Sequence, residues 1–140
     1  MKNNIKLILL ITVGFFTASC SKVDPASQIQ LTEQMLQGKT WLLNYSITQT
    51  GTSSVTKTYV GQSTYFINFL KDKSTKDSDG IVGVYNIEKV GNQLQIHVNA
   101  ITNGSNPVEY IYNIESVGSK ELIVFHTANN QTIKRYFSAR

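Results

Sequence analysis

Cysteine is nearly absent from this chain of 140 residues, in which Cys20 is the only thiol. A single thiol excludes a disulfide within the monomer, so the fold has to be held together by an apolar core. Long apolar runs are also missing, because the most apolar segment extends only from Leu7 to Phe16. A membrane-spanning helix needs about 20 apolar residues to cross roughly 30 Å of hydrocarbon, so this segment is too short to be one.

A strong excess of charge is lacking too. The formal net charge is +4, and two of the positive charges, Lys2 and Lys6, lie in an N-terminal segment that we expect to be removed. Further along, lysines alternate with acids between Lys71 and Asp77, which is typical of a solvated loop. We therefore expect no nucleic-acid partner.

Groups for metal binding and catalysis are sparse. His97 and His126 are the only histidines, and they fall on predicted strands with another strand between them, nearly 10 Å apart and too far for bonds of about 2 Å to one metal ion. The segment 75–80, TKDSDG, has a likeness to a calcium loop but lacks its first aspartate and its bidentate glutamate. No nucleophile elbow and no paired carboxylates on one strand face are present. We expect no metal, no cofactor and no enzyme activity.

The N-terminus does contain an ordered pattern. Lys2 and Lys6 precede the apolar segment, and the small residues Thr17, Ala18 and Ser19 follow it, which predicts a secretory signal peptide over 1–19. Removal of this segment leaves 121 residues, the length of one domain. We expect residues 20–27 to be a spacer and 28–140 to form that domain.

The residues before Cys20 resemble a bacterial lipobox. The resemblance implies that Cys20 carries a diacylglycerol and becomes the first residue of the mature chain, where more than one acyl chain gives stable membrane attachment. The alternative is an ordinary signal peptide followed by an incidental free thiol. Ser21, not aspartate, follows the cysteine, and residues 22–25 carry no dense acidic cluster. By resemblance to envelope sorting rules, this implies the outer membrane, with the periplasmic face favoured over the cell surface.

From Thr40 to the C-terminus the sequence alternates with period two in runs rich in Val, Ile, Tyr and Phe. In the first run, Trp41, Leu43, Tyr45 and Ile47 share one face. The segment 71–80 is predicted to be a loop, and a short helix is predicted over 27–38. The runs predict eight strands, at 40–49, 55–60, 63–70, 81–88, 93–101, 108–116, 121–127 and 132–139.

Short connections between these runs indicate antiparallel neighbours. Closing an eight-stranded meander removes the two free edges and leaves an interior wide enough for side chains or one small ligand. The sequence therefore favours an all-β fold, an eight-stranded up-and-down barrel with one N-terminal helix. A two-sheet sandwich is the alternative.

The stretch "GKTWLLNYSI" and the hairpins "GIVGVYNIEKVGNQLQIHV" and "YIYNIESVGSKELIVFH" resemble the lipocalin-like lipoproteins of Bacteroidota. The glycine lies three residues before the tryptophan here, not two as in lipocalins. The resemblance implies that Trp41 closes the barrel floor beneath an arginine of the last strand, Arg135 or Arg140.

The tyrosines of the predicted strands include Tyr45, Tyr65, Tyr85, Tyr110 and Tyr112, which mostly follow the apolar face. If the barrel is hollow, we expect Tyr65, Tyr85 and Tyr110 to line the cavity, although aromatic side chains more often fill a core. Two functions follow. The first is a lipid-anchored protein that binds a small apolar or amphipathic ligand, and the second is an envelope interaction protein of inhibitor or immunity type, with a filled barrel and a contact loop at 71–80.

Overall fold

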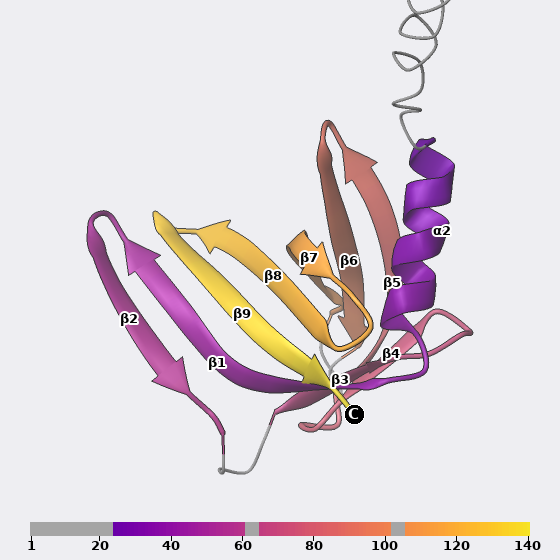
Figure 1. The fold of residues 1–140 in the computed structure, drawn as a ribbon. Helices are drawn as coiled ribbons and strands as arrows, with labels where there is room; N and C mark the ends of the chain where they lie inside the picture. Colours follow the sequence, from indigo (N-terminus) through magenta and orange to yellow (C-terminus); the bar gives the residue numbers. More distant parts are fainter. Residues whose placement is uncertain (1–23, 61–64, 102–105) are drawn as a thin grey trace, which may run out of the picture.

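The computed structural model describes residues 24–60, 65–101 and 106–140. The predicted signal peptide and residues 20–23 of the predicted spacer, Cys20 among them, lie outside this part of the chain. Among the described residues, no helix is long and apolar enough to cross a membrane. The elements are α2 (Pro25–Leu36), β1 (Thr40–Thr50), β2 (Ser53–Thr58), β3 (Phe66–Phe69), β4 (Ser74–Asp77), β5 (Val82–Val90), β6 (Gln93–Ile101), β7 (Val108–Val117), β8 (Glu121–Ala128) and β9 (Gln131–Ala139) (Figure 1).

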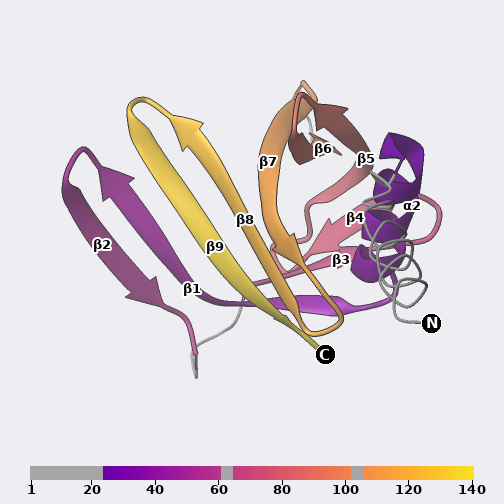
Figure 2. The ribbon, with the colours of Figure 1, turned by 45° about the horizontal axis from the view of Figure 1, so that its top comes forward.

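Eight antiparallel strands close into a barrel, which confirms the predicted fold class. Each strand from β3 to β9 pairs with the next, β3 pairs with β1, and β9 returns to β1. The remaining strand, β2, is not one of the eight barrel strands and pairs with β1 alone. In Figure 2 the hairpins β1–β2 and β8–β9 stand on one side of the barrel, and β5 to β7 with α2 stand on the other.

Strands β2 and β3 share one edge of β1. β2 pairs with Tyr45 to Thr50, whereas β3 pairs with Thr40 to Leu42. The opposite edge of β1 is occupied by β9 from Trp41 to Thr50. The barrel wall therefore contains β3 only at the Trp41 end of β1, and β2 extends the wall at the other end.

The segment 71–80 is not the loop that the sequence predicts, because Ser74–Asp77 forms β4 in the barrel wall. The prediction fails because β4 has no apolar alternation: its inward residues are Thr75 and Asp77, which are buried all the same. Lys73, with φ of 67°, makes the turn from β3. Four of the ten residues of the predicted contact loop are thus part of the barrel wall.

Strand β1 contains a bulge that corrects its predicted faces. Its pairing with β9 shifts between Leu43 and Tyr45, so Asn44 is the extra residue. Trp41 and Leu43 point inward as expected, but beyond the bulge Ser46 is the buried residue. Tyr45 instead stacks on Tyr136, with ring centroids 4.2 Å apart.

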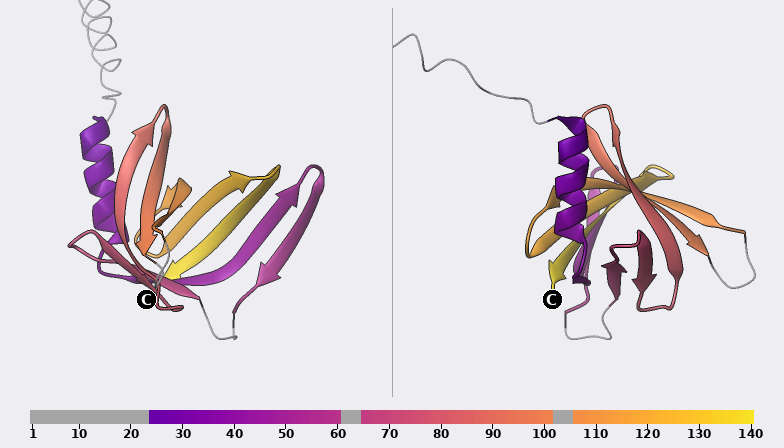
Figure 3. Two further views of the ribbon diagram at one scale, coloured as in Figure 1. Left: turned by 180° about the vertical axis from the view of Figure 1, so that it is seen from behind. Right: turned by 90° about the vertical axis from the view of Figure 1, so that its right-hand side faces the viewer.

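Helix α2 begins at Pro25, two residues before the predicted start. Asp24 is the N-cap and accepts a hydrogen bond from the Ser27 amide at 3.3 Å, and Pro25 occupies the first turn. The helix ends before Gly38, whose φ of 72° suits a left-handed turn. α2 packs against β5 and β7 and lies beside β5 (Figure 3).

Candidate ligand-binding cavity

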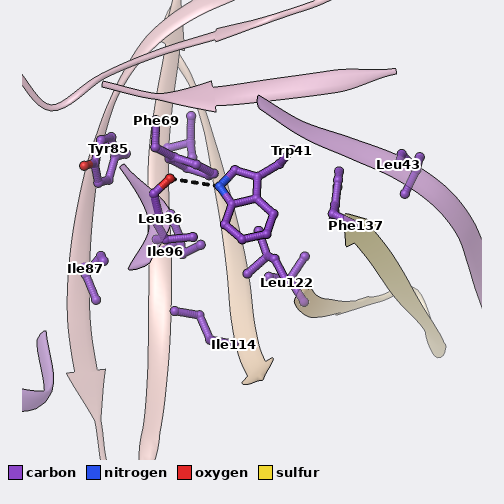
Figure 4. Packing of buried hydrophobic residues seen from close by; sticks show 12 residues of the cluster. Leu36, Trp41, Leu43, Phe69, Tyr85, Ile87, Ile96, Ile114, Leu122 and Phe137 are labelled. Atoms are coloured by element: carbon purple, nitrogen blue, oxygen red, sulfur yellow. Dashed lines mark hydrogen bonds between the residues drawn. The ribbon is translucent and has the colours of Figure 1, made fainter. Parts of the chain in front are cut away.

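One end of the barrel is closed around Trp41. Its side chain is 0% exposed, and its Nε1–H donates to the carbonyl of Leu36, the last residue of α2, at 2.9 Å (Figure 4). Leu36 is itself fully buried in the same cluster as Phe69, Ile96 and Leu122. Helix α2 therefore seals this end, and the hydrogen bond satisfies a helix-terminal carbonyl that would otherwise be orphaned.

The cation over Trp41 is not an arginine, which corrects the expected pairing. Lys39 Nζ lies 5.2 Å from the ring centroid and donates to the carbonyl of Met35 at 2.6 Å. Arg135 is too far along the barrel, because Trp41 pairs with Ala139 whereas Arg135 pairs with Ser46. Four residues of strand separate these levels, about 13 Å. Arg140, the alternative, pairs with Thr40 through its backbone and is exposed.

Above this floor the barrel encloses a cavity of about 370 Å³. Its apolar floor is formed by residues that also belong to the buried core, among them Phe69, Ile96, Leu122 and Phe137. Its remaining wall combines apolar side chains with tyrosines and charged groups. These are Leu43, Tyr59, Tyr65, Ile67, Asp77, Asp79, Ile81, Val98, Ala100, Tyr110, Tyr112, Val124 and Arg135.

Two of the three tyrosines predicted to line a cavity do so. Tyr65 and Tyr110 are in its wall, and Tyr110 is 40% exposed, which places it where the cavity meets solvent. Tyr85 is not in the wall. Its ring packs edge-on against Phe69, and its hydroxyl accepts from Gln37 Nε2 at 2.8 Å and donates to the Leu70 carbonyl at 3.3 Å. Tyr85 is therefore a core residue of the closed end.

Tyr65 and Asp77 form a partly buried polar pair in the wall. The Tyr65 hydroxyl donates to Asp77 Oδ2 at 3.1 Å, and Asp77 Oδ1 accepts from the amides of Asp79 and Ile81 at 3.0 and 2.9 Å. Burial, and then the Asp77 charge, raise the pKa of Tyr65 well above its ordinary value. Tyr65 is thus a neutral hydroxyl, and Asp77 secures the turn between β4 and β5. The calcium likeness of 75–80 is explained by this turn.

Arg135, Tyr112 and His126 form a second cluster. The Arg135 guanidinium lies over the Tyr112 ring, 5.6 Å from its centroid, and the His126 ring meets Tyr112 edge-on at 6.1 Å. Burial raises the pKa of Tyr112, and burial together with the Arg135 charge lowers the pKa of His126. His126 Nδ1 is buried and has no hydrogen-bond partner within the described part of the chain. Tyr112 is thus in contact with both the Arg135 cation and the His126 ring.

Tyr59, Tyr112, Asp77 and Arg135 line the cavity, and sequence reasoning did not assign them to it. Tyr112 has a signal, because it follows Tyr110 at a spacing of two on one strand. Asp77 and Arg135 have no such signal, because charged residues ordinarily face solvent. Here each shares the inward face of its strand with a buried residue, Thr75 or Phe137.

The outer face holds the other histidine. His97 Nδ1 lies 3.0 Å from Glu109 Oε1, and Nε2 lies 3.1 Å from Gln95 Oε1. His97 and His126 do not meet. In the part of the chain that the structure describes, no three histidine, cysteine or carboxylate side chains gather as a metal site.

Comparisons of the chain with protein-family models, with curated proteins and with solved structures find no match. The lipocalin-like resemblance therefore stays a prediction from the sequence. Function is inferred from the barrel and from the chemistry of its cavity.

Proposed function

We propose that this chain is a lipid-anchored envelope lipoprotein whose barrel binds a small amphipathic molecule. The observation that carries the proposal is the cavity of about 370 Å³ inside the barrel. Ligand pockets generally measure about 300 to 1,000 Å³ and combine a mostly apolar wall with a few polar groups. The cavity has both properties.

The distribution of polarity in the cavity favours an amphipathic ligand over a wholly polar one. Phe69, Ile96 and Leu122 are core residues that form the floor next to Trp41, and a cavity floored by such side chains favours an apolar tail. Tyr65 lies at the level of Leu43 and Arg135 at the level of Ser46, so both lie further along the barrel than Trp41, toward the end that α2 leaves uncovered. The polar head of the ligand would lie at their level.

The membrane attachment and the location rest on the sequence. Cys20, four residues before the helix cap Asp24, would carry the lipid, and the barrel would lie on the periplasmic face of the outer membrane. Intact-mass measurement of protein extracted from envelopes tests this part: a mature chain beginning at an acylated Cys20 supports it. A chain that retains residues 1–19, or an unmodified thiol, contradicts it.

Ligand binding is tested with a pair of tryptophan variants. Val124 is buried in the cavity wall, whereas Val84 on β5 is 54% exposed and faces outward. Val124→Trp fills the cavity, and Val84→Trp adds the same bulk outside it. Envelope-purified protein in phospholipid nanodiscs is titrated with a neutral, environment-sensitive fluorophore.

We expect Val124→Trp to reduce affinity by about tenfold or more and Val84→Trp to leave it unchanged. Overpacking destabilises cores, so the milder Ala100→Leu, also in the cavity wall, is measured beside them with circular dichroism as the folding check. Equal binding by all four proteins would place the fluorophore outside the barrel and contradict the proposal.

A partner-binding role is the second candidate, and an exposed apolar face favours it. Val82 and Ile101 pair across β5 and β6, and with Val84 and Ile111 they leave apolar side chains exposed on this side of the barrel. Cross-linking in intact envelopes with Val84→Lys as the interface variant tests it. A protein partner lost in Val84→Lys and kept in Val124→Trp would favour this role over ligand binding.

A further inference from the structure

We propose that Arg135 is the binding site for an anionic head group, so that the ligand is an amphipathic molecule with one apolar chain and a carboxylate or phosphate. This inference rests on the proposed function, because it needs the barrel to hold a ligand. It adds the chemical class of that ligand and the residue that selects it.

Arg135 faces the interior because it shares the inward side of β9 with the buried Phe137, and the bulge at Asn44 decides which residue of β1 lies opposite it. Past the bulge, Ser46 pairs with Arg135, and Ser46 is the residue of β1 that is buried there. The large Tyr45 side chain is directed out to Tyr136. The guanidinium therefore faces a small hydroxymethyl group across the strand pair, and it lies in the cavity wall.

Arg135 has no carboxylate partner among the described residues. The ion pairs there join Lys73 to Glu33, Lys134 to Glu115, and His97 to Glu88 and Glu109. The Tyr112 ring attracts the guanidinium but does not neutralise it. Charged groups away from bulk water are ordinarily paired, so this cation in a cavity wall is suited to an anion that enters from outside.

Asp77 is a carboxylate of the same cavity wall that could pair with Arg135, but both of its oxygens accept other hydrogen bonds. Oδ2 accepts from Tyr65, and Oδ1 accepts from the amides of Asp79 and Ile81. Among the described residues Asp77 forms no ion pair with Arg135, and its hydrogen bonds to the Asp79 and Ile81 amides hold the turn between β4 and β5. Asp79 also lines the cavity but is exposed, so its charge is screened by solvent.

The groups around Arg135 suit a head group in one orientation. Tyr112 is held neutral by burial, so its hydroxyl is able to donate to an anion. Arginine presents paired N–H groups that match the two oxygens of a carboxylate or phosphate. An anion on Arg135 would leave an attached apolar chain on the side of Phe137 and Leu122, toward the floor.

The test compares ten-carbon ligands that differ only in the head group: decanoate, decyl phosphate, decanol and decyltrimethylammonium. Each displaces the neutral fluorophore from the protein in nanodiscs at pH 7.5, with empty nanodiscs subtracted. The variants are Arg135→Met, which removes the charge and keeps an unbranched apolar stem, and Arg135→Lys, which keeps the charge. Lys134→Gln is the matched control, because it removes a cation from the outer face of the same strand.

We expect decanoate or decyl phosphate to bind the unaltered protein about tenfold more tightly than decanol, since charge-assisted hydrogen bonds are the stronger class. Whichever of the two anions binds more tightly identifies the head group. Arg135→Met should abolish the preference without weakening decanol, Arg135→Lys should keep part of it, and Lys134→Gln should keep all of it.

The outcomes separate this inference from the proposed function. Binding of decanol and decanoate with equal affinity, unchanged by Arg135→Met, would overturn the head-group site and leave the ligand-binding barrel standing. A preference for decyltrimethylammonium would also overturn it, in favour of Asp77 and Asp79. If none of the four ligands displaces the fluorophore, the proposed function itself fails.

Discussion

Tyr45 stacks on Tyr136 with ring centroids 4.2 Å apart and 16° between the ring planes, and neither side chain lines the cavity. Regular alternation with Trp41 and Leu43 would have placed Tyr45 inside. The bulge at Asn44 reverses this, because it sends the bulky ring outward and leaves Ser46 facing Arg135. The cavity thus depends on one irregularity in β1.

We predict that the Tyr45–Tyr136 pair stabilises the fold by about 0.5 to 1.5 kcal/mol beyond the area that it buries. A double-mutant cycle of Tyr45→Ala and Tyr136→Ala, measured by urea unfolding, gives this coupling. The pair Tyr45→Ala and Tyr110→Ala is the control, because Tyr110 lies on β7 with no ring contact to Tyr45, and distant sites add within about 0.5 kcal/mol. Zero coupling in the first cycle would mean that the rings do not stack in solution.

Trp41→Phe should lower the free energy of unfolding by about 1 to 3 kcal/mol, because the buried Leu36 carbonyl loses its donor. Urea denaturation of the two proteins measures the difference. Leu31→Ala, at an exposed site on α2, controls for changes in the helix and should cost much less. A loss from Trp41→Phe no larger than that of Leu31→Ala would argue against the sealed end.

Gly83→Ala should be strongly destabilising, whereas Gly118→Ala should be tolerated. A Cβ on Gly83 would lie 2.7 Å from the Asn99 carbonyl oxygen and 3.1 Å from Ala100 Cα, both backbone atoms of β6. On Gly118 the nearest atom would be 3.9 Å away. Overpacking of this kind costs about 1 to 3 kcal/mol. Thermal melts of both variants check the contrast, and equal melting temperatures would mean that β5 and β6 are further apart.

The neutral form of His126 should be favoured in the folded protein. Burial and the Arg135 charge lower its pKa below 6.5, so the unfolded chain binds this proton at higher pH than the folded chain does. Stability should therefore fall as the pH drops below about 6.5 toward the folded pKa, and be unaffected by this group at higher pH. A histidine NMR titration measures the pKa directly.

Urea unfolding at pH 7.5 and 5.0 measures the same effect as stability. Its control is His126→Phe, which keeps a ring beside Tyr112 and should remove this part of the pH dependence. A folded pKa of His126 at or above 6.5, or an unchanged pH dependence in the variant, would contradict the buried position.

Much of the barrel is predictable, because seven of its eight strands have apolar residues at every second position. The prediction that Trp41, near the start of the first strand, lies inside is confirmed. β4 was not predictable, because its buried positions are Thr75 and Asp77, which resemble loop residues. The bulge at Asn44 cannot be recognised from the amino-acid composition of β1. The predicted inward and outward faces of β1 are therefore wrong beyond Asn44.

The site was predictable only in part. Tyr65 and Tyr110 lie on the inward faces of their strands, toward the open end of the barrel. How far along the barrel axis an inward residue lies depends on the pairing register of its strand, which the alternation of the sequence does not show. Tyr85 therefore belongs to the core of the closed end. The same limit affects Arg135, since its alignment with Ser46 and not with Trp41 comes from the pairing of β1 with β9.

The most direct test of a hollow, ligand-binding barrel is the location of a bound molecule. Nuclear Overhauser effects between bound decanol and methyl-labelled protein in nanodiscs measure it. We predict cross-peaks to Ile96, Leu122 and Val124 in the cavity wall. Cross-peaks confined to Val82, Val84 and Ile101 on the outer face would contradict the account.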